Sequence, residues 1–164
     1  MSIVLVGAPG SGKTTVGGLL AEKLERDFID VDQRIEEVVG KPIAEIFADE
    51  GEAHFRELEE SATLELIQSE SVVSLGGGAV MNPRIRAALA AHDVVWLEVS
   101  ISQATRRVGM NKVRPLLLGN VRGRLVALLR ERTPVYEAVS TSSINTDDAT
   151  AEEIATELAN RRRP

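Results

Sequence analysis

VGAPGSGKTT, at residues 6–15, is the most informative stretch of this chain, and it raises the question of where a bound phosphate would go next. It matches the pattern G-x-x-x-x-G-K-[ST] at Gly7, Gly12, Lys13 and Thr14. An apolar run precedes it and a helical pattern follows, which is the setting that a phosphate-binding loop requires. Glycines let successive backbone N–H groups turn toward phosphate oxygens, and the start of a helix adds partial positive charge. We therefore expect a nucleotide phosphate site at Gly10, Ser11, Gly12, Lys13, Thr14 and Thr15.

Two side chains of this loop carry chemistry of their own. Lys13 is spaced to reach the β and γ phosphates, and the Thr14 hydroxyl is spaced to ligate Mg²⁺. The alternative is a glycine-rich turn with an exposed lysine. The strand and helix patterns on either side favour the phosphate site.

Apolar, β-branched runs alternate with helical segments along the chain, which is typical of βαβ units. The pattern predicts an α/β fold of three layers, αβα, with a central parallel sheet of five strands. We expect strands at 2–7, 27–31, 71–78, 93–99 and 140–145. We expect helices at 12–24, 83–91 and 101–108, from about 121, and in a closing segment to 163, with residues 133–139 as a separate segment. Residues 32–68 read as helical pieces, broken near Gly40, Pro42 and Gly51.

Composition narrows the class of protein. The 164 residues, 43% of them hydrophobic, suit one domain spanning 1–164. The net charge of −6 and an aromatic content of 3% argue against a nucleic-acid partner. There is no cysteine, no signal-like N-terminus and no run of 18 apolar residues, so we expect a cytoplasmic protein without a membrane partner.

Polar groups follow two of the other predicted strands. Asp30 and Asp32 end the second strand, and Gly76, Gly77 and Gly78 end the third. Ligands of open α/β sheets bind beyond the carboxyl ends of the strands, so these residues are candidates for an acceptor site. The aspartates also fit solvated strand ends or a helix cap, with Asp32 the candidate cap, and the glycines also fit a flexible turn.

Arg56 lies within FRELE, residues 55–59, on the helix expected after Gly51. A guanidinium there could bind an anionic acceptor. Taken alone, it fits equally a surface ion pair with Glu59, three residues later.

Six motifs in order resemble the shikimate kinase family, which has the nucleoside-monophosphate-kinase fold. They are the P-loop, DVD (30–32), FRELE (55–59), GGG (76–78), RPLL (114–117) and RTPVY (132–136). The resemblance implies a P-loop fold of the NTP-hydrolase type with a mobile lid at about 109–120. It also implies transfer of the γ-phosphoryl group of Mg·ATP to the 3-hydroxyl of shikimate, giving shikimate 3-phosphate and ADP in the pathway to chorismate and aromatic amino acids.

The resemblance implies a role for each matching residue. Thr14 would bind Mg²⁺ directly, and Asp30 would act through a water molecule. Asp32 would orient the shikimate hydroxyl or accept its proton. The implied shikimate carboxylate site consists of Arg56 and Arg132, with the backbone of Gly77 and Gly78 beside it. A planar guanidinium binds a carboxylate through two hydrogen bonds, which agrees with that role.

Two further arginines match the nucleotide side of the family. Arg114 corresponds to the lid arginine over the phosphates, and Arg107 to a residue that stacks on adenine. Arg107 also fits a solvated helix position beside Arg106. The chain departs from the family at 145–153, NTDDATAEE, where an arginine and a proline are common, so we expect backbone atoms to hold adenine there.

Other interpretations stay open at this point. A gluconate or nucleoside monophosphate kinase, a nucleotide-dependent switch and an inactive family member all fit the P-loop. We expect a monomer whose partners are shikimate and ATP. His54 and His92 lack metal-spaced partners, and Trp96 and Tyr136 are expected in or near the core, with no part for Tyr136 in the chemistry.

Overall fold

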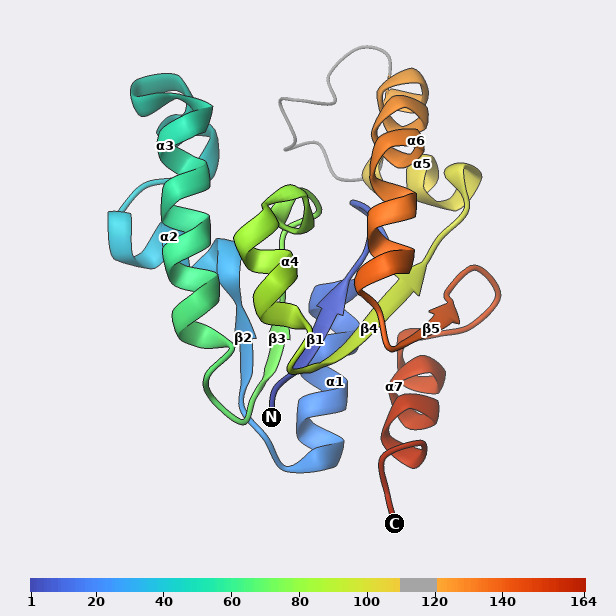
Figure 1. Cartoon of the computed structure of the whole chain (residues 1–164). Coiled ribbons are helices and arrows are strands. Elements are labelled where there is room, and N and C mark those ends of the chain that lie inside the picture. Colours follow the sequence, from blue (N-terminus) through green and yellow to red (C-terminus); the bar gives the residue numbers. More distant parts are fainter. Residues whose placement is uncertain (110–120) are drawn as a thin grey trace.

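A five-stranded parallel sheet lies at the centre of the computed structural model, which describes residues 1–109 and 121–164 (Figure 1). Its order is β2-β3-β1-β4-β5, with every pair parallel. The strands are β1 (Ile3–Val6), β2 (Phe28–Asp30), β3 (Val72–Ser74), β4 (Asp93–Glu98) and β5 (Ser142–Asn145). Since β1 lies between β3 and β4, the P-loop that follows it emerges at the middle of the sheet's carboxyl edge.

Strand β1 shows why the sheet is covered on both faces. Its four residues are all buried. Side chains alternate along a strand, so Ile3 and Leu5 pack into one core cluster while Val4 and Val6 pack into the other. A continuous apolar run is what a central parallel strand requires.

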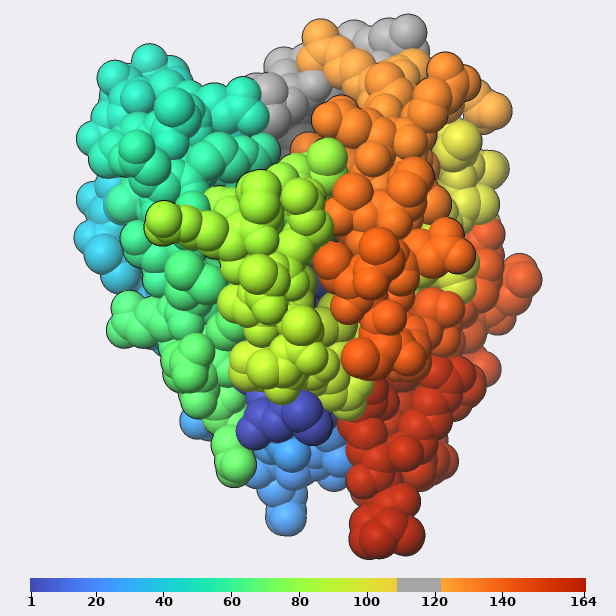
Figure 2. Space-filling model, in the orientation of Figure 1, coloured from blue at the N-terminus to red at the C-terminus, as the bar shows by residue number. Residues whose placement is uncertain are grey.

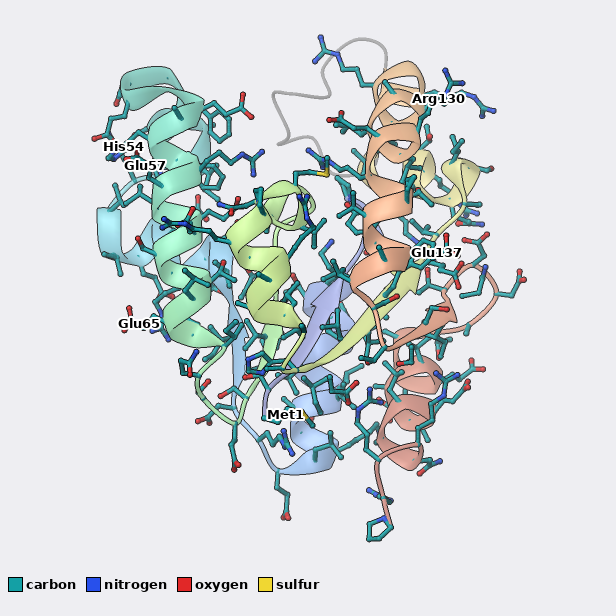
Figure 3. All side chains as sticks on the ribbon, viewed as in Figure 1. Met1, His54, Glu57, Glu65, Arg130 and Glu137 are labelled. Carbon is teal, nitrogen blue, oxygen red and sulfur yellow. The ribbon has the colours of Figure 1, made fainter. Side chains whose placement is uncertain are left out.

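Helices cover the two faces unequally. One face packs against α1 (Lys13–Leu24) and α7 (Ala151–Asn160). The other packs against α2 (Val31–Val39), α3 (Ile43–Leu66), α4 (Pro83–Leu89) and α6 (Val121–Val139), and α5 (Ile101–Gly109) lies beside α6. Figure 2 shows α3, α4 and α6 side by side over this second face, and Figure 3 shows Arg130 and Glu137 projecting outward from α6. The predicted three-layer αβα fold is confirmed.

The predicted helix breaks are present. Gly40 ends α2 with φ 82°, and Gly51 interrupts α3 with φ 85°. Both angles lie in the left-handed region, which glycine adopts without steric cost. The cap of α2 differs from the candidate that the sequence offered. Asp30, not Asp32, caps α2, since its side chain accepts a hydrogen bond from the Gln33 N–H at 3.1 Å.

Helix α6 is longer than its sequence indicates. We expected a separate segment at 133–139, but the helix continues to Val139 with Pro134 inside it. Proline removes a helical hydrogen bond and costs about 3 kcal/mol in a helix interior. Leu125 and Tyr136, on either side of it, are almost fully buried, and this packing favours the continuous helix. No helix in the described part of the chain is long and apolar enough to cross a membrane.

Candidate active site

The P-loop joins β1 to α1, and the N-terminus of α1 has no side-chain cap from the described residues. Gly10 and Gly12 have φ values of 82° and 90°, in the region that favours glycine. Gly12 occupies the cap position of α1 and makes no side-chain cap hydrogen bond. The first N–H groups of a helix carry partial positive charge, so this end can accept an anion.

Lys13 lies within the curve of the loop. Its Nζ donates hydrogen bonds to the carbonyl oxygens of Gly7 at 2.7 Å and Ala8 at 3.1 Å. The side chain is only half exposed, which disagrees with the alternative of an exposed lysine on a simple turn. The predicted phosphate residues therefore form one loop and the first turn of α1, where Thr14 and Thr15 are exposed.

Thr14 and Asp30 meet beside this loop. The Thr14 hydroxyl donates to Oδ2 of Asp30 at 3.0 Å. Both are hard oxygen donors, which Mg²⁺ prefers, and both are accessible from the phosphate loop. The pair therefore fits the predicted magnesium position. In the parts of the chain that the structure describes, no group of three or more His, Cys, Asp or Glu side chains is placed to hold a metal ion.

The glycines after β3 are surrounded by the charged residues predicted from sequence. A methyl group built on Gly76 would lie 2.9 Å from each carboxylate oxygen of Asp32. One built on Gly78 would lie 2.9 Å from Nη2 of Arg56 and 3.0 Å from Nη2 of Arg132. The turn at 76–78, called the glycine turn below, thus brings together a carboxylate and two guanidinium groups from three different helices. It is not merely a flexible connection.

Glu59 organises the arginines of this turn. Its Oε1 accepts from Nη1 of Arg56 at 2.9 Å, and its side chain is 2% exposed against 33% for Arg56. Burial raises the pKa of the Glu59 carboxyl, although the positive charges of Arg56 and Arg132 oppose that rise. The buried Glu59 carboxylate therefore holds Arg56 in place and faces the charge of Arg132.

Arg107 joins the P-loop to the segment after β5. Its Nη1 donates to the Gly10 carbonyl at 3.0 Å, and its Nη2 donates to the Thr146 carbonyl at 2.9 Å. It is therefore not a freely solvated helix residue. The Thr146 hydroxyl also accepts from Nη1 of Arg107 at 3.2 Å. Thr146 was missed from sequence, because a single threonine after a strand belongs to no motif. Arg114 and the predicted lid at about 109–120 lie outside the described residues, apart from Gly109.

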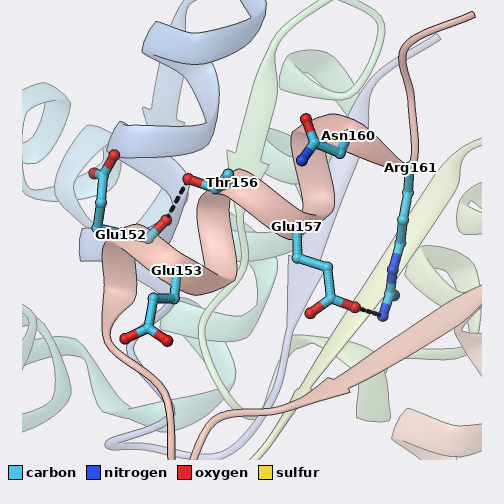
Figure 4. Close-up of a pocket in the computed structure, with 6 residues that line it drawn as sticks. All are labelled: Glu152, Glu153, Thr156, Glu157, Asn160 and Arg161. Carbon is cyan, nitrogen blue, oxygen red and sulfur yellow. Dashed lines mark hydrogen bonds and ion pairs between the residues drawn. The ribbon is translucent and has the colours of Figure 1, made fainter.

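Two hollows lie outside the glycine turn. One, of about 390 Å³, lies next to Ala8 at the carboxyl ends of β4 and β5, and its lining includes Trp96, Leu129, Thr133 and Asp147. The other, of about 580 Å³, lies on α7 and contains none of the predicted site residues. Figure 4 shows that its six lining residues all come from the end of the chain that forms α7, with Glu157 paired to Arg161.

The histidines have local partners. His54 lies 3.7 Å from Glu50 on α3, where Figure 3 places it on the outer side of the helix. Nδ1 of His92 accepts from the Ser2 N–H at 3.3 Å. Neither lies among the residues around the glycine turn.

Comparison with known proteins identifies the family. A family model described as shikimate kinase matches residues 9–162. The chain belongs to the shikimate kinase family. It is 50% identical to the shikimate kinase of Thermobifida fusca (strain YX) over 157 residues, 95% of this chain and 91% of that one. It is 54% identical to the shikimate kinase of Salinispora tropica over 157 residues, 95% of this chain and 94% of that one.

A solved shikimate kinase has the same fold. The structure of shikimate kinase from Acinetobacter baumannii in complex with shikimate superposes with a TM-score of 0.92 at 37% identity, covering 99% of this chain and 95% of that one. As a shikimate kinase, the chain is an ATP-dependent phosphotransferase with an alcohol acceptor. This assignment replaces the interpretations as a gluconate kinase, a nucleoside monophosphate kinase or a nucleotide switch.

Proposed function

We propose that the chain transfers the γ-phosphoryl group of Mg·ATP to the 3-hydroxyl of shikimate at the glycine turn, using the residues that meet there. The meeting of Asp32, Arg56 and Arg132 around Gly76–Gly78, beside the P-loop, carries this proposal. It joins a phosphate site to a site with one carboxylate and two guanidinium groups. Such a pair of sites suits a hydroxylated carboxylic acid as the acceptor.

Arg56 and Arg132 bind the shikimate carboxylate. Each guanidinium presents a planar fork of N–H donors that matches a carboxylate. Glu59 holds Arg56 through Nη1. Both Nη atoms of Arg56 and Nη2 of Arg132 approach Gly78. The missing side chains of Gly77 and Gly78 leave room for the substrate to lie against the backbone.

Asp32 orients the 3-hydroxyl and accepts its proton. A carboxylate beside the glycine turn can take a hydrogen bond from the attacking hydroxyl, which fixes the direction of attack. Lys13 and the loop N–H groups of residues 10–15 hold the phosphates. These groups act by position and charge, which is where most catalysis of phosphoryl transfer comes from.

Thr14 would hold Mg²⁺ directly, and Asp30 would hold it through a water molecule. Bound there, the cation would neutralise charge on the phosphate oxygens. Phosphate and water oxygens would complete its coordination shell, since Mg²⁺ usually keeps several waters.

The resemblance to the family supplies the remaining assignments. Arg107 contributes to the adenine site through its position between the P-loop and Thr146. Arg114, within a lid at 109–120, acts on the phosphates, and closure of the lid excludes water. Residues 1–164 form a single kinase domain that acts as a cytoplasmic monomer, without nucleic-acid or membrane partners. Sedimentation at the monomer mass of 17.7 kDa tests the oligomeric state.

ADP release by the purified protein tests the acceptor. The assay contains Mg·ATP with no acceptor, shikimate, gluconate or AMP in parallel. We expect strong dependence on shikimate and only slow release otherwise. Release that depends on gluconate or AMP would overturn the assignment of the arginine pair, and slow release with every acceptor would indicate an inactive family member.

Arg132→Ala tests the carboxylate site separately. We expect a raised KM for shikimate and an unchanged KM for ATP, because the lost guanidinium serves only the acceptor. An unchanged KM for shikimate would remove Arg132 from the acceptor site while leaving the kinase activity established.

A further inference from the structure

Tyr136, the only tyrosine of the chain, lies beneath the glycine turn. It is 1% exposed, and its hydroxyl donates to the carbonyl oxygen of Gly77 at 2.6 Å. A methyl group built on Gly77 would lie 3.5 Å from this hydroxyl and 3.2 Å from Nη1 of Arg132. The hydroxyl therefore lies where the glycine turn meets Arg132. The sequence indicated only a core residue with no part in the chemistry.

The hydrogen-bonding capacity of a phenol fixes how this contact works. A tyrosine hydroxyl has one proton to donate, and here the Gly77 carbonyl takes it. Toward any other group the oxygen can only accept. Arginine has donors and no acceptor, and Nη1 of Arg132 lies near the hydroxyl, since both approach Gly77. Arg132 can therefore donate to Tyr136, which donates to Gly77.

We propose that Tyr136 is a positioning residue for shikimate, whose hydroxyl sets the Arg132 guanidinium relative to the backbone of the glycine turn. This inference rests on the carboxylate role proposed for Arg132. Arg132 and Tyr136 are four residues apart on α6, so their side chains lie on one face of the helix. The Gly77 carbonyl that accepts from Tyr136 belongs to the glycine turn, which follows β3. The hydroxyl thus ties the helix that carries one arginine to the turn against which the acid binds.

Packing around the Tyr136 ring holds its hydroxyl at the Gly77 carbonyl. Trp96 of β4 packs near it, with ring centroids 6.2 Å apart. Burial raises the pKa of Tyr136 to about 12, with the Arg132 charge opposing the rise. The phenol therefore keeps its proton throughout the neutral range, and its effect on shikimate binding is independent of pH there.

A double-mutant cycle between Tyr136→Phe and Arg132→Lys tests the inference. Phenylalanine keeps the ring and removes the hydroxyl, and lysine keeps the charge but loses the planar fork. We expect Tyr136→Phe to raise the KM for shikimate about tenfold to hundredfold, as for loss of one hydrogen bond to a charged group, with the KM for ATP unchanged. In the Arg132→Lys background, the same change should add less than about twofold, because contacting residues are coupled.

Thr141→Val is the matched control. The Thr141 hydroxyl accepts from the Val94 N–H at 3.0 Å near the start of β4, at the end of the strand opposite the site. Like Tyr136→Phe, the Thr141→Val substitution removes a hydroxyl that bonds to the backbone. We expect a lower melting temperature and an unchanged KM for shikimate. An equal rise of this KM in both variants would reduce the Tyr136 effect to general loss of stability and overturn the inference.

The outcomes separate the two proposals. If Arg132→Lys raises the KM for shikimate and Tyr136→Phe does not, the positioning role is wrong while the carboxylate site stands. Additive effects of the two changes also overturn the positioning role. If neither change affects this KM, the carboxylate role of Arg132 fails, and the inference fails with it.

A second experiment labels Tyr136 without removing its hydroxyl, so it does not depend on whether Tyr136→Phe folds. Growth with 3-fluorotyrosine labels position 136 alone, because the chain has one tyrosine. We expect saturating shikimate to shift the ¹⁹F resonance in the otherwise unchanged protein and to shift it less in Arg132→Lys. A resonance unmoved by shikimate, or moved equally in both proteins, would overturn the inference.

Discussion

Crowding by charged side chains explains the three consecutive glycines at 76–78. Unlike Gly10 and Gly12, these residues do not have positive φ values. Any side chain at Gly76 would meet Asp32, and any at Gly78 would meet Arg56 and Arg132. A side chain at Gly76 or Gly78 would therefore displace the charged groups that lie next to it. Substitution should therefore affect substrate binding before it affects the fold.

Gly78→Ala is expected to raise the KM for shikimate. The added methyl group would lie within 3.0 Å of the guanidinium nitrogens, which must move. Overpacking of this kind costs about 1–3 kcal/mol, or roughly fivefold to hundredfold in affinity. Gly18→Ala is the control, because no atom outside its own helix lies within 4 Å of the new methyl group. It should stabilise α1 by up to about 1 kcal/mol without changing KM, and equal kinetics in the two variants would contradict the prediction.

Asp32→Asn is expected to lower kcat by about 10²-fold to 10⁴-fold, as for loss of a general base. The amide keeps the size of the side chain, so binding of ATP should stay unchanged. Steady-state rates at saturating shikimate measure the effect. Unaffected turnover would remove the catalytic role of Asp32.

At the scale of elements, the start of α2 combines two tasks in one residue. One oxygen of Asp30 caps the helix through the Gln33 N–H, and the other accepts from the Thr14 hydroxyl. A helix cap and a proposed magnesium position therefore share a single carboxylate. The position of α2 and the position of the metal ligand are set together.

Substitution of Asp30 should separate its two tasks. Asn caps a helix about as well as Asp, so Asp30→Asn should leave the free energy of unfolding nearly unchanged, whereas Asp30→Ala should lower it by about 1 kcal/mol. Both variants lose the charge, so both should need more Mg²⁺ for half-maximal activity. Denaturant unfolding and a Mg²⁺ titration measure the two effects. A normal Mg²⁺ requirement in Asp30→Asn would contradict the metal role.

The sequence predicted the helices and strands better than it predicted where they end or which distant segments they contact. Alternating apolar and helical patterns locate all five strands, most clearly the central ones, where burial on both faces leaves a continuous apolar run such as Ile3–Val6. Ends depend on neighbours, so the run expected at 71–78 pairs only over Val72–Ser74. Pro134 misled the prediction for α6, since local propensity cannot register tertiary packing. The contact of Tyr136 with Gly77 joins distant segments and leaves no local pattern.

Over the whole molecule, positive side chains gather at the site of an otherwise acidic protein. The net charge is −6, yet Arg56 and Arg132 converge on the glycine turn, with Lys13 in the neighbouring P-loop. The turn follows β3 and the loop follows β1, and these strands are adjacent in the sheet. The strand order therefore places the two proposed anion sites next to each other. Burying Glu59 among these cations has a cost that depends on pH.

Glu59→Gln should change the pH dependence of stability. Burial raises the pKa of Glu59 above its ordinary value of 4.5, so the folded protein holds this proton more tightly than the unfolded chain. Its stabilising contribution is present below about pH 4.5 and is lost as pH rises through the raised pKa. Relative to Glu59→Gln, the unchanged protein should therefore lose stability across that window. Urea unfolding between pH 4 and 8 measures this difference, and a difference independent of pH would contradict the prediction.

The packing of Trp96 against Tyr136 gives the protein a built-in optical reporter. The chain has one tryptophan, which lines the cavity next to Ala8 of the P-loop and lies 6.2 Å from the tyrosine under the glycine turn. Indole emission responds to the polarity and the quenching groups around the ring. When the indole alone is excited, at wavelengths beyond tyrosine absorption, the emission comes from a single position between the proposed nucleotide and acceptor sites. Stopped-flow fluorescence can then follow the order in which the two substrates arrive.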